Sequence, residues 1–411
     1  MSYKWGSSPS ISVSISALLI PLAAVGTATT ISYFQKWAAK TVRKVLEVTD
    51  PIRPRGEEVS ALLRPQISLD RIEAHIQERD NVIQGAERCI VWADKKNKAK
   101  TNLCIVYLHG WSACRQECSP VPEMIANALN ANLFCDRLPG HGRRHPRGVL
   151  GGGGPSGEAL LEEATPRRLF LRAVDSIRIG LSLGERVVLV GMSTGGALFT
   201  WLTSLDTVQP SIAALVLISP AYALAHPLYP VLKHTLATLR LLPNQIRSTL
   251  LDLILGPTKT AAKLSEEHHR YTTLTYPTAA ILHLIDVLWE IETVQMSSIQ
   301  VPTLVIGNPD DHVVNFRVKA TNAFLQLGPS PRKMLYCIST TEHPHTIASK
   351  ISSPKSYHEI AQIIIGFLED AFSSPTKASI PLSRAASVPI GLGAYGRSFP
   401  SLSDLTRPLE A

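Results

Sequence analysis

The strongest constraint on the fold is the pentapeptide Gly-Met-Ser-Thr-Gly at residues 191–195, which matches the pattern G-x-S-x-G. The apolar, β-branched run Val187 to Val190 precedes it and predicts a buried strand. Small apolar residues at helical spacing follow, so a strand, a sharp turn and a helix are expected in succession. The glycines suit such a turn because its crowded backbone leaves no space for Cβ atoms at the flanks. Ser193 is therefore expected at the tip of the turn, with its Oγ atom facing solvent.

The chain alternates predicted strands and helices on both sides of this turn. Further strands are predicted at 89–93, 102–108, 131–137, 211–218, 303–307 and 334–339, and helices at 121–129, 168–183 and 357–372. This alternation predicts an α/β fold, with a mostly parallel sheet covered by helices on both faces. Ligands of such sheets bind beyond the carboxyl ends of the strands, so the motifs that directly follow strands are expected to meet at one edge.

The length of 411 residues accommodates one large domain with appendages. Residues 51–372 are predicted to form this domain. The Leu-rich segment 221–298 interrupts the strand–helix alternation and is too long to be a loop in a compact domain, so we expect an inserted helical cap. Residues 373–411 are rich in Ser, Pro and Gly, which predicts a disordered tail.

The N-terminal residues 1–50 are predicted to form a separate segment. Residues 11–34 are apolar over a length that spans a bilayer as a helix, and a cleaved signal peptide or a targeting segment is the alternative. Basic residues follow at 36–49, where the sequence predicts an interfacial juxtamembrane helix. Because basic flanks stay on the cytoplasmic side, we expect a single-pass, membrane-associated protein with its catalytic domain in the cytoplasm.

Composition narrows the classes of partner. The net charge of +8 is compatible with nucleic acid or with an anionic membrane surface. The sequence has no interleaving of aromatic and basic residues and no nucleic-acid-binding module, so no nucleic-acid partner is expected. The six cysteines are scattered and predict free thiols, and no zinc site is expected because Cys114 and Cys118 have no matching second pair.

Residues suited to support a serine nucleophile follow the last two predicted strands. A serine hydroxyl needs a base and an orienting carboxylate. Two acids, Asp310 and Asp311, follow the strand at 303–307, and two histidines, His343 and His345, follow the strand at 334–339. The order serine, acid, histidine is that of an α/β-hydrolase. The backbone N–H groups of Trp111 and Thr194 are expected to form the oxyanion hole.

Five short motifs stand after predicted strands: Leu-His-Gly-Trp at 108–111, Arg-Leu-Pro-Gly-His-Gly at 137–142, Gly-Met-Ser-Thr-Gly-Gly at 191–196, Asn-Pro-Asp-Asp-His-Val-Val at 308–314 and His-Thr-Ile-Ala at 345–348. With them the chain resembles the α/β-hydrolase fold family over about residues 100–372. The resemblance is to its group of monoglyceride lipases, lysophospholipases and serine aminopeptidase-like carboxylesterases. The motifs are specific for fold and reaction type, and carry little information on the substrate.

The resemblance implies one choice at each ambiguous position. Members of the group often have Asp-x-Val-Val after this strand, which selects Asp311, whereas the count Gly-x-x-Asp from Gly307 selects Asp310 as the alternative acid. His345 begins His-x-Ile-Ala at an expected helix start, as in relatives, and His343 is the alternative base. His109 and His141 are expected to shape local turns rather than to act in catalysis.

The predicted function is a serine hydrolase, carboxylesterase- or lipase-like, that cleaves esters through an acyl-enzyme without a metal or organic cofactor. The apolar cap and N-terminal segment favour a lipid ester as the substrate, namely a lysophospholipid or a monoacylglycerol. A short-chain carboxylesterase and an acyltransferase are the alternatives among enzymes. A catalytically silent α/β-hydrolase binding protein is the alternative of another class, since fold alone does not give function.

Overall fold

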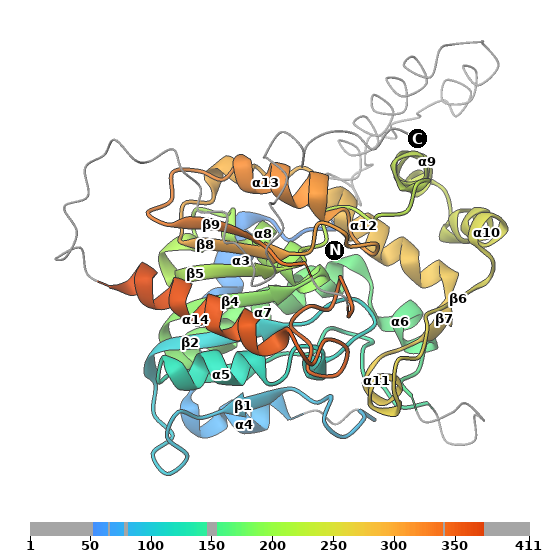
Figure 1. The fold of residues 1–411 in the computed structure, drawn as a ribbon. Helices are drawn as coiled ribbons and strands as arrows, with labels where there is room; N and C mark the ends of the chain where they lie inside the picture. Colours follow the sequence, from blue (N-terminus) through green and yellow to red (C-terminus); the bar gives the residue numbers. More distant parts are fainter. Residues whose placement is uncertain (1–51, 65, 78–80, 146–153, 340–341, 374–411) are drawn as a thin grey trace, which may run out of the picture.

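The computed structural model describes residues 52–64, 66–77, 81–145, 154–339 and 342–373 (Figure 1). The predicted N-terminal segment 1–50 lies outside the described residues, as does the predicted tail from residue 374 onward.

A seven-stranded sheet forms the centre of the molecule, in the order β1-β3-β2-β4-β5-β8-β9. Only β1 is antiparallel to its neighbour, and the other strand pairs are parallel. The mostly parallel sheet predicted from the sequence is therefore confirmed. The strands are β1 (Cys89–Val91), β2 (Thr101–Leu108), β3 (Asn132–Cys135), β4 (Gly184–Met192), β5 (Ile212–Ile218), β8 (Thr303–Gly307) and β9 (Lys333–Cys337).

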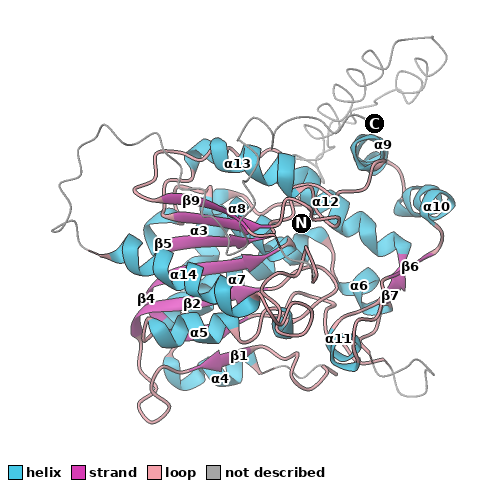
Figure 2. Cartoon of the chain, in the orientation of Figure 1, coloured by secondary structure: helices cyan, strands magenta, loops and turns pink. Residues whose placement is uncertain are grey.

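Helices cover both faces of the sheet (Figure 2). Successive strand side chains point to opposite faces, so Val187 and Leu189 of β4 join one core cluster while Val188 and Val190 join the other. Helices α7 and α8 pack on the first face, and α5 and α14 pack on the second. These helices are α5 (Val121–Ala128), α7 (Pro166–Leu183), α8 (Thr194–Thr203) and α14 (Tyr357–Phe372). Shorter helices are α3 (Gly56–Leu63), α4 (Leu69–Ile76), α6 (Glu158–Glu163) and α13 (Thr321–Leu325).

The segment 221–298 is mainly helical, but it also contains a two-stranded antiparallel ladder that the sequence did not predict. Each strand of the ladder has three residues, which is too short to produce a recognisable alternation of apolar and polar residues. Helix α12 is almost entirely buried and packs against α8 and α9. The elements are α9 (Tyr229–Thr238), α10 (Asn244–Leu255), β6 (Thr258–Thr260), α11 (Glu266–Tyr271), β7 (Thr275–Pro277) and α12 (Ile281–Ile291).

The prediction of a single-pass membrane protein has to be corrected. In the described part of the chain, no helix combines the length and the apolar character that crossing a bilayer requires. The longest described helix, α7, has 18 residues and includes Arg172, Asp175 and Arg178 among its charged side chains, which a lipid-facing span does not carry. Residues 11–34, the predicted span, lie outside the described residues.

Candidate active site

Ser193 lies at the junction of β4 and α8, on a strained turn. Its φ of 50° and ψ of −113° place it in a region that residues with a Cβ rarely adopt. The turn is crowded as the sequence predicted, because a Cβ on Gly195 would lie 2.1 Å from the carbonyl oxygen of Leu108. The Ser193 N–H donates to the carbonyl oxygen of Ile218 at 2.9 Å, which fixes the turn against the end of β5.

The side chains of Ser193, His345 and Asp311 form one hydrogen-bonded series. The Nε2 atom of His345 lies 3.1 Å from the Oγ atom of Ser193, and its Nδ1 atom lies 2.7 Å from Oδ2 of Asp311. With the Nδ1–H donating to Asp311, Nε2 is left as the acceptor for the serine hydroxyl. All three residues are buried. This arrangement suits a serine whose proton is removed by an oriented imidazole.

The carboxylate oxygen of Asp311 that does not face His345 is fixed by the backbone of its own loop. Its Oδ1 atom accepts the backbone N–H groups of Val313 at 2.8 Å and Val314 at 3.0 Å, so the loop after β8 fixes the carboxylate that faces His345. On His345, burial by itself lowers the imidazole pKa, but the charge and hydrogen bond of Asp311 and the charge of Glu117 outweigh it. The net result is a pKa of His345 above its ordinary value of 6.5.

The structure does not bring the alternative acid and base into this series. The Asp310 carboxylate is 69% exposed and pairs with Arg317 at 3.0 Å, away from His345. The Nδ1 atom of His343 accepts the backbone N–H of Thr346 at 3.3 Å, a contact within its own loop. Burial, followed by the charges of His345 and other histidines, lowers the pKa of His343 to about 4.

The sequence predicts that the backbone N–H groups of Thr194 and Trp111 form the oxyanion hole. Thr194 is the first residue of α8, where helix N–H groups have no partner within the helix and the helix dipole favours negative charge. Trp111 follows Gly110 in the loop after β2. Neither N–H donates a hydrogen bond to another residue in the described part of the chain. Both are therefore open to an oxygen that carries developing negative charge.

His109 holds the loop that carries Trp111. Its Nε2 atom accepts the backbone N–H of Leu138 at 3.0 Å, and its Nδ1–H donates to the carbonyl oxygen of Gly110 at 2.8 Å. The ring also lies 5.1 Å from that of His141, measured between centroids. Burial lowers the pKa of His109 to about 4, so it stays neutral in this structural role.

Glu117 is a charged residue at the site that the sequence did not indicate. It ends a short 3₁₀ helix, η2 (Arg115–Glu117), and its Oε2 atom accepts the N–H of Gly110 at 2.8 Å. A Cβ on Gly110 would lie 3.0 Å from the Cβ of Ser193 and 3.1 Å from Oε1 of Glu117, so both side chains flank the same glycine. Burial raises the pKa of the Glu117 carboxyl group to about 7, although the hydrogen bond from Gly110 and the charge of His345 act against the rise.

The 221–298 segment contacts the loop after β2 that carries Trp111 and Ser112. The Trp111 ring packs edge-on against Tyr276 of β7, with centroids 6.5 Å apart, and the N–H of Thr273 donates to the carbonyl oxygen of Ser112 at 2.7 Å. Within the described ranges, no group of three or more His, Cys, Asp or Glu side chains is arranged to hold a metal ion.

Comparisons with known proteins relate the chain to α/β-hydrolases. The family model described as "Serine aminopeptidase, S33" matches residues 170–347, a range that includes Ser193, Asp311 and His345. This match confirms the resemblance to serine aminopeptidase-like α/β-hydrolases inferred from the sequence motifs. A search of curated proteins found no match.

Among solved structures, the chain is similar to one from a study of LipS and LipT, two metagenome-derived lipolytic enzymes. The match has 18% identity and a TM-score of 0.52, and it covers 70% of this chain and 99% of that chain. The chain is also similar to the monoacylglycerol lipase of Paleococcus ferrophilus (17% identity, TM-score 0.46, covering 69% and 98%). A soluble variant of monoglyceride lipase from Saccharomyces cerevisiae gives 16% identity and a TM-score of 0.47, covering 73% and 98%. The first match and the sheet order confirm the predicted α/β-hydrolase fold.

Proposed function

We propose that this chain, which has the α/β-hydrolase fold, is a serine hydrolase that cleaves carboxylic esters. The observation that carries the proposal is the series from Ser193 through His345 to Asp311, with contacts of 3.1 and 2.7 Å. Hydroxyl, imidazole and carboxylate in this order activate a serine for attack on an acyl carbon.

In the first half of the reaction, the Oγ atom of Ser193 attacks the ester carbonyl carbon while Nε2 of His345 takes its proton. The carbonyl oxygen becomes an oxyanion, which the N–H groups of Trp111 and Thr194 stabilise. When this tetrahedral intermediate collapses, the bond to the alkoxy oxygen breaks and the imidazolium of His345 protonates the departing alcohol. Ser193 then carries the acyl group as an ester.

The second half releases the acid. His345 removes a proton from a water molecule, which attacks the acyl carbon and forms a second oxyanion at the same two N–H groups. Collapse breaks the bond to Oγ of Ser193, which recovers its proton from His345. Asp311 holds the imidazole in the required tautomer in both halves.

The proposed substrate is a lipid ester, a lysophospholipid or a monoacylglycerol. The support is the distribution of exposed large apolar side chains: of nine in the described part of the chain, six lie in the 221–298 segment. An acyl chain that leaves water for apolar protein surface gains about 0.8 kcal/mol per buried CH₂ group, so a cap of this composition favours long chains. The six residues are Leu228, Val231, Ile246, Leu253, Ile254 and Leu264.

The test is a series of p-nitrophenyl esters, from acetate to palmitate, assayed with the full chain. We expect kcat/KM to rise with acyl length, and long-chain monoacylglycerol or lysophospholipid to be hydrolysed. Ser193→Ala is expected to lower kcat by about a thousandfold or more. The matched control is Ser204→Ala, which removes a hydroxyl at the end of α8 and is expected to keep normal rates. Preference for acetate would contradict the lipid substrate, and full activity of Ser193→Ala would contradict the serine mechanism.

A further inference from the structure

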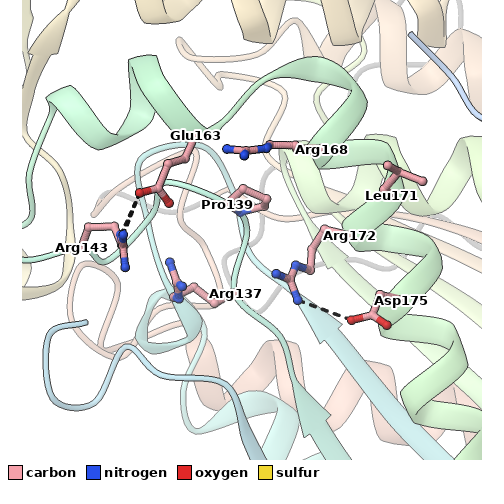
Figure 3. A pocket seen from close by; sticks show the side chains of 8 residues that line it. All are labelled: Arg137, Pro139, Arg143, Glu163, Arg168, Leu171, Arg172 and Asp175. Carbon is pink, nitrogen blue, oxygen red and sulfur yellow. Dashed lines mark hydrogen bonds and ion pairs between the residues drawn. The ribbon is translucent and has the colours of Figure 1, made fainter. Parts of the chain in front are cut away.

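A cavity outside the candidate active site is lined by four arginines (Figure 3). It has a volume of about 590 Å³, within the range of small-molecule sites. None of Ser193, Asp311 and His345 lines it. The lining comes from the turn after β3, from α6 and from the first half of α7, and it consists of Arg137, Pro139, Arg143, Glu163, Arg168, Leu171, Arg172 and Asp175.

The lining carries more positive than negative charge. Of its two acidic side chains, Glu163 pairs with Arg143 at 2.8 Å. Asp175 pairs with Arg172 at 3.4 Å and also with two arginines outside the lining, Arg88 at 3.1 Å and Arg178 at 2.5 Å. With four arginines and two acids, the lining itself has an excess of two positive charges, and the buried carboxylate of Asp136 lies 3.9 Å from Arg172 behind it. In Figure 3, Arg168 and Arg172 extend from α7, and Arg137 and Arg143 lie across the cavity from them.

Arg168 is the lining cation with the fewest constraints. Its side chain is exposed on the first turns of α7, and it has no hydrogen-bond or ion-pair partner in the described ranges. Arg137, in contrast, is buried, and its Nη1–H group donates to the carbonyl oxygen of His141 at 2.6 Å. The cavity therefore combines a rigid guanidinium at its base with an adaptable one at its rim.

The first turns of α7 carry one arginine without an acidic partner. The helix dipole favours negative charge there, and the first turn has no acidic residue of its own. Arg167 pairs with Glu58 of α3 at 2.6 Å, whereas Arg168 has no ion-pair partner in the described ranges. Arg168 and Arg172 are four residues apart and share one helix face, where like charges destabilise a helix. An anion between them would relieve this repulsion.

We propose that this cavity binds the phosphate group of a phosphate monoester. A phosphate monoester carries a charge of about −1.5 to −2 at pH 7, which matches the excess of two positive charges, whereas a single carboxylate would neutralise only half of it. The guanidinium fork of Arg168 provides paired N–H donors that phosphate oxygens accept, and Arg137 and Arg172 add positive charge around them. The phosphate belongs either to a small soluble molecule or to the head group of a lipid, since both present the same dianion.

Calorimetric titration of the full chain with glycerol 1-phosphate tests the proposal, and the readout does not depend on ester hydrolysis. We expect binding to the wild type and weakening of about tenfold or more in Arg168→Gln, since the variant loses a charge-assisted hydrogen bond to the phosphate. The matched control is Arg71→Gln, which removes an exposed arginine of α4 outside the cavity and is expected to bind normally. Thermal melting of each variant verifies that it is folded.

A second arm identifies the source of the phosphate. A short-chain 1-acylglycerol 3-phosphate, kept below its micellar concentration, is titrated into Ser193→Ala so that the ester stays intact. Affinity equal to that of glycerol 1-phosphate supports a soluble ligand, and affinity at least tenfold higher supports a lipid head group. The absence of binding of both ligands at millimolar concentration would overturn the proposal. Equal weakening by Arg168→Gln and Arg71→Gln would also overturn it, because general charge attraction would then account for the binding.

Discussion

The Oε2 atom of Glu117 accepts a hydrogen bond from the N–H of Gly110 at 2.8 Å, and Gly110 lies against Ser193. A second carboxyl group therefore lies at the candidate active site, besides that of Asp311. Its charge raises the pKa of His345, and burial raises its own pKa to about 7. Glu117 therefore both holds the loop at Gly110 and influences the protonation state of His345.

The first prediction concerns the pH dependence of Glu117→Gln. Glutamine keeps an oxygen that accepts the Gly110 N–H but removes the negative charge that favours the imidazolium of His345. The pKa of His345 should therefore fall, and because catalysis needs the neutral imidazole, the acidic limb of the kcat/KM profile should move to lower pH than in the wild type. The profile is measured by ester hydrolysis.

Glu57→Gln, at an exposed position of α3, is the control and should leave the limb in place. A limb that stays fixed or moves to higher pH in Glu117→Gln would contradict this role.

The second prediction concerns a buried charge cluster under α7. Asp136 is fully buried and accepts hydrogen bonds from Arg88 at 2.9 Å and from Ser176 at 2.5 Å. Asp136→Asn removes the closest carboxylate of Arg88, which is 7% exposed and keeps a second pair with Asp175 at 3.1 Å. Loss of one partner of a buried ion pair destabilises a protein by about 3–5 kcal/mol, and the remaining pair places the expected loss toward the lower end. Urea denaturation at pH 7 should show this loss, and Asp70→Asn at an exposed ion pair should show no measurable change.

The stability difference caused by Asp136→Asn should itself depend on pH. Burial raises the pKa of Asp136, but the charges of Arg88 and Arg172 and the hydrogen bonds it accepts outweigh burial, so its pKa lies below the ordinary value of 3.8. A carboxyl group with a lowered folded-state pKa stabilises the fold above its unfolded pKa and loses that contribution as the pH falls through the folded pKa. The wild type and Asp136→Asn should therefore converge in strongly acidic solution. An undiminished difference there would contradict an ionic origin.

The third prediction separates the two neighbouring acids. Asp311→Asn should lower kcat by about 10⁴-fold, because the amide no longer holds His345 in the tautomer that accepts the serine proton. Asp310→Asn should keep most of the activity, since the Asp310 carboxylate is exposed and pairs with Arg317. Steady-state ester hydrolysis by both variants provides the comparison, with folding verified by circular dichroism. A reversed ranking would assign the orienting role to Asp310.

The sequence was sufficient to predict a mostly parallel sheet in which the motifs follow strands, because the central strands are apolar runs buried on both faces. Val187 to Val190 is such a run, and the glycines after it leave only a sharp turn open to Ser193. The sequence also narrowed the acid to two neighbouring residues. The loop after β8 separates them: the Asp310 N–H bonds to the Asn308 side chain, and Asp311 accepts two N–H groups of its own loop.

The features that escaped prediction depend on contacts between segments that carry no local pattern. Glu117 reaches Gly110 only because the η2 turn folds back under the β2 loop, and an isolated Glu among Cys and Gln residues gives no motif. The arginine cavity likewise joins the turn after β3 to α6 and α7. Within the 221–298 segment, β6 and β7 are too short for their pairing to be read from alternation.

The central claim is that Ser193 is the nucleophile, and covalent labelling tests it most directly. The full-length chain is treated with a fluorophosphonate probe, which reacts with an activated serine oxygen, and the labelled peptide is identified by mass spectrometry. The account predicts a single modification on Ser193, slowed by orders of magnitude in Asp311→Asn and absent in Ser193→Ala. Absence of labelling in the folded wild type, or a modification at another serine that persists in Ser193→Ala, would contradict it.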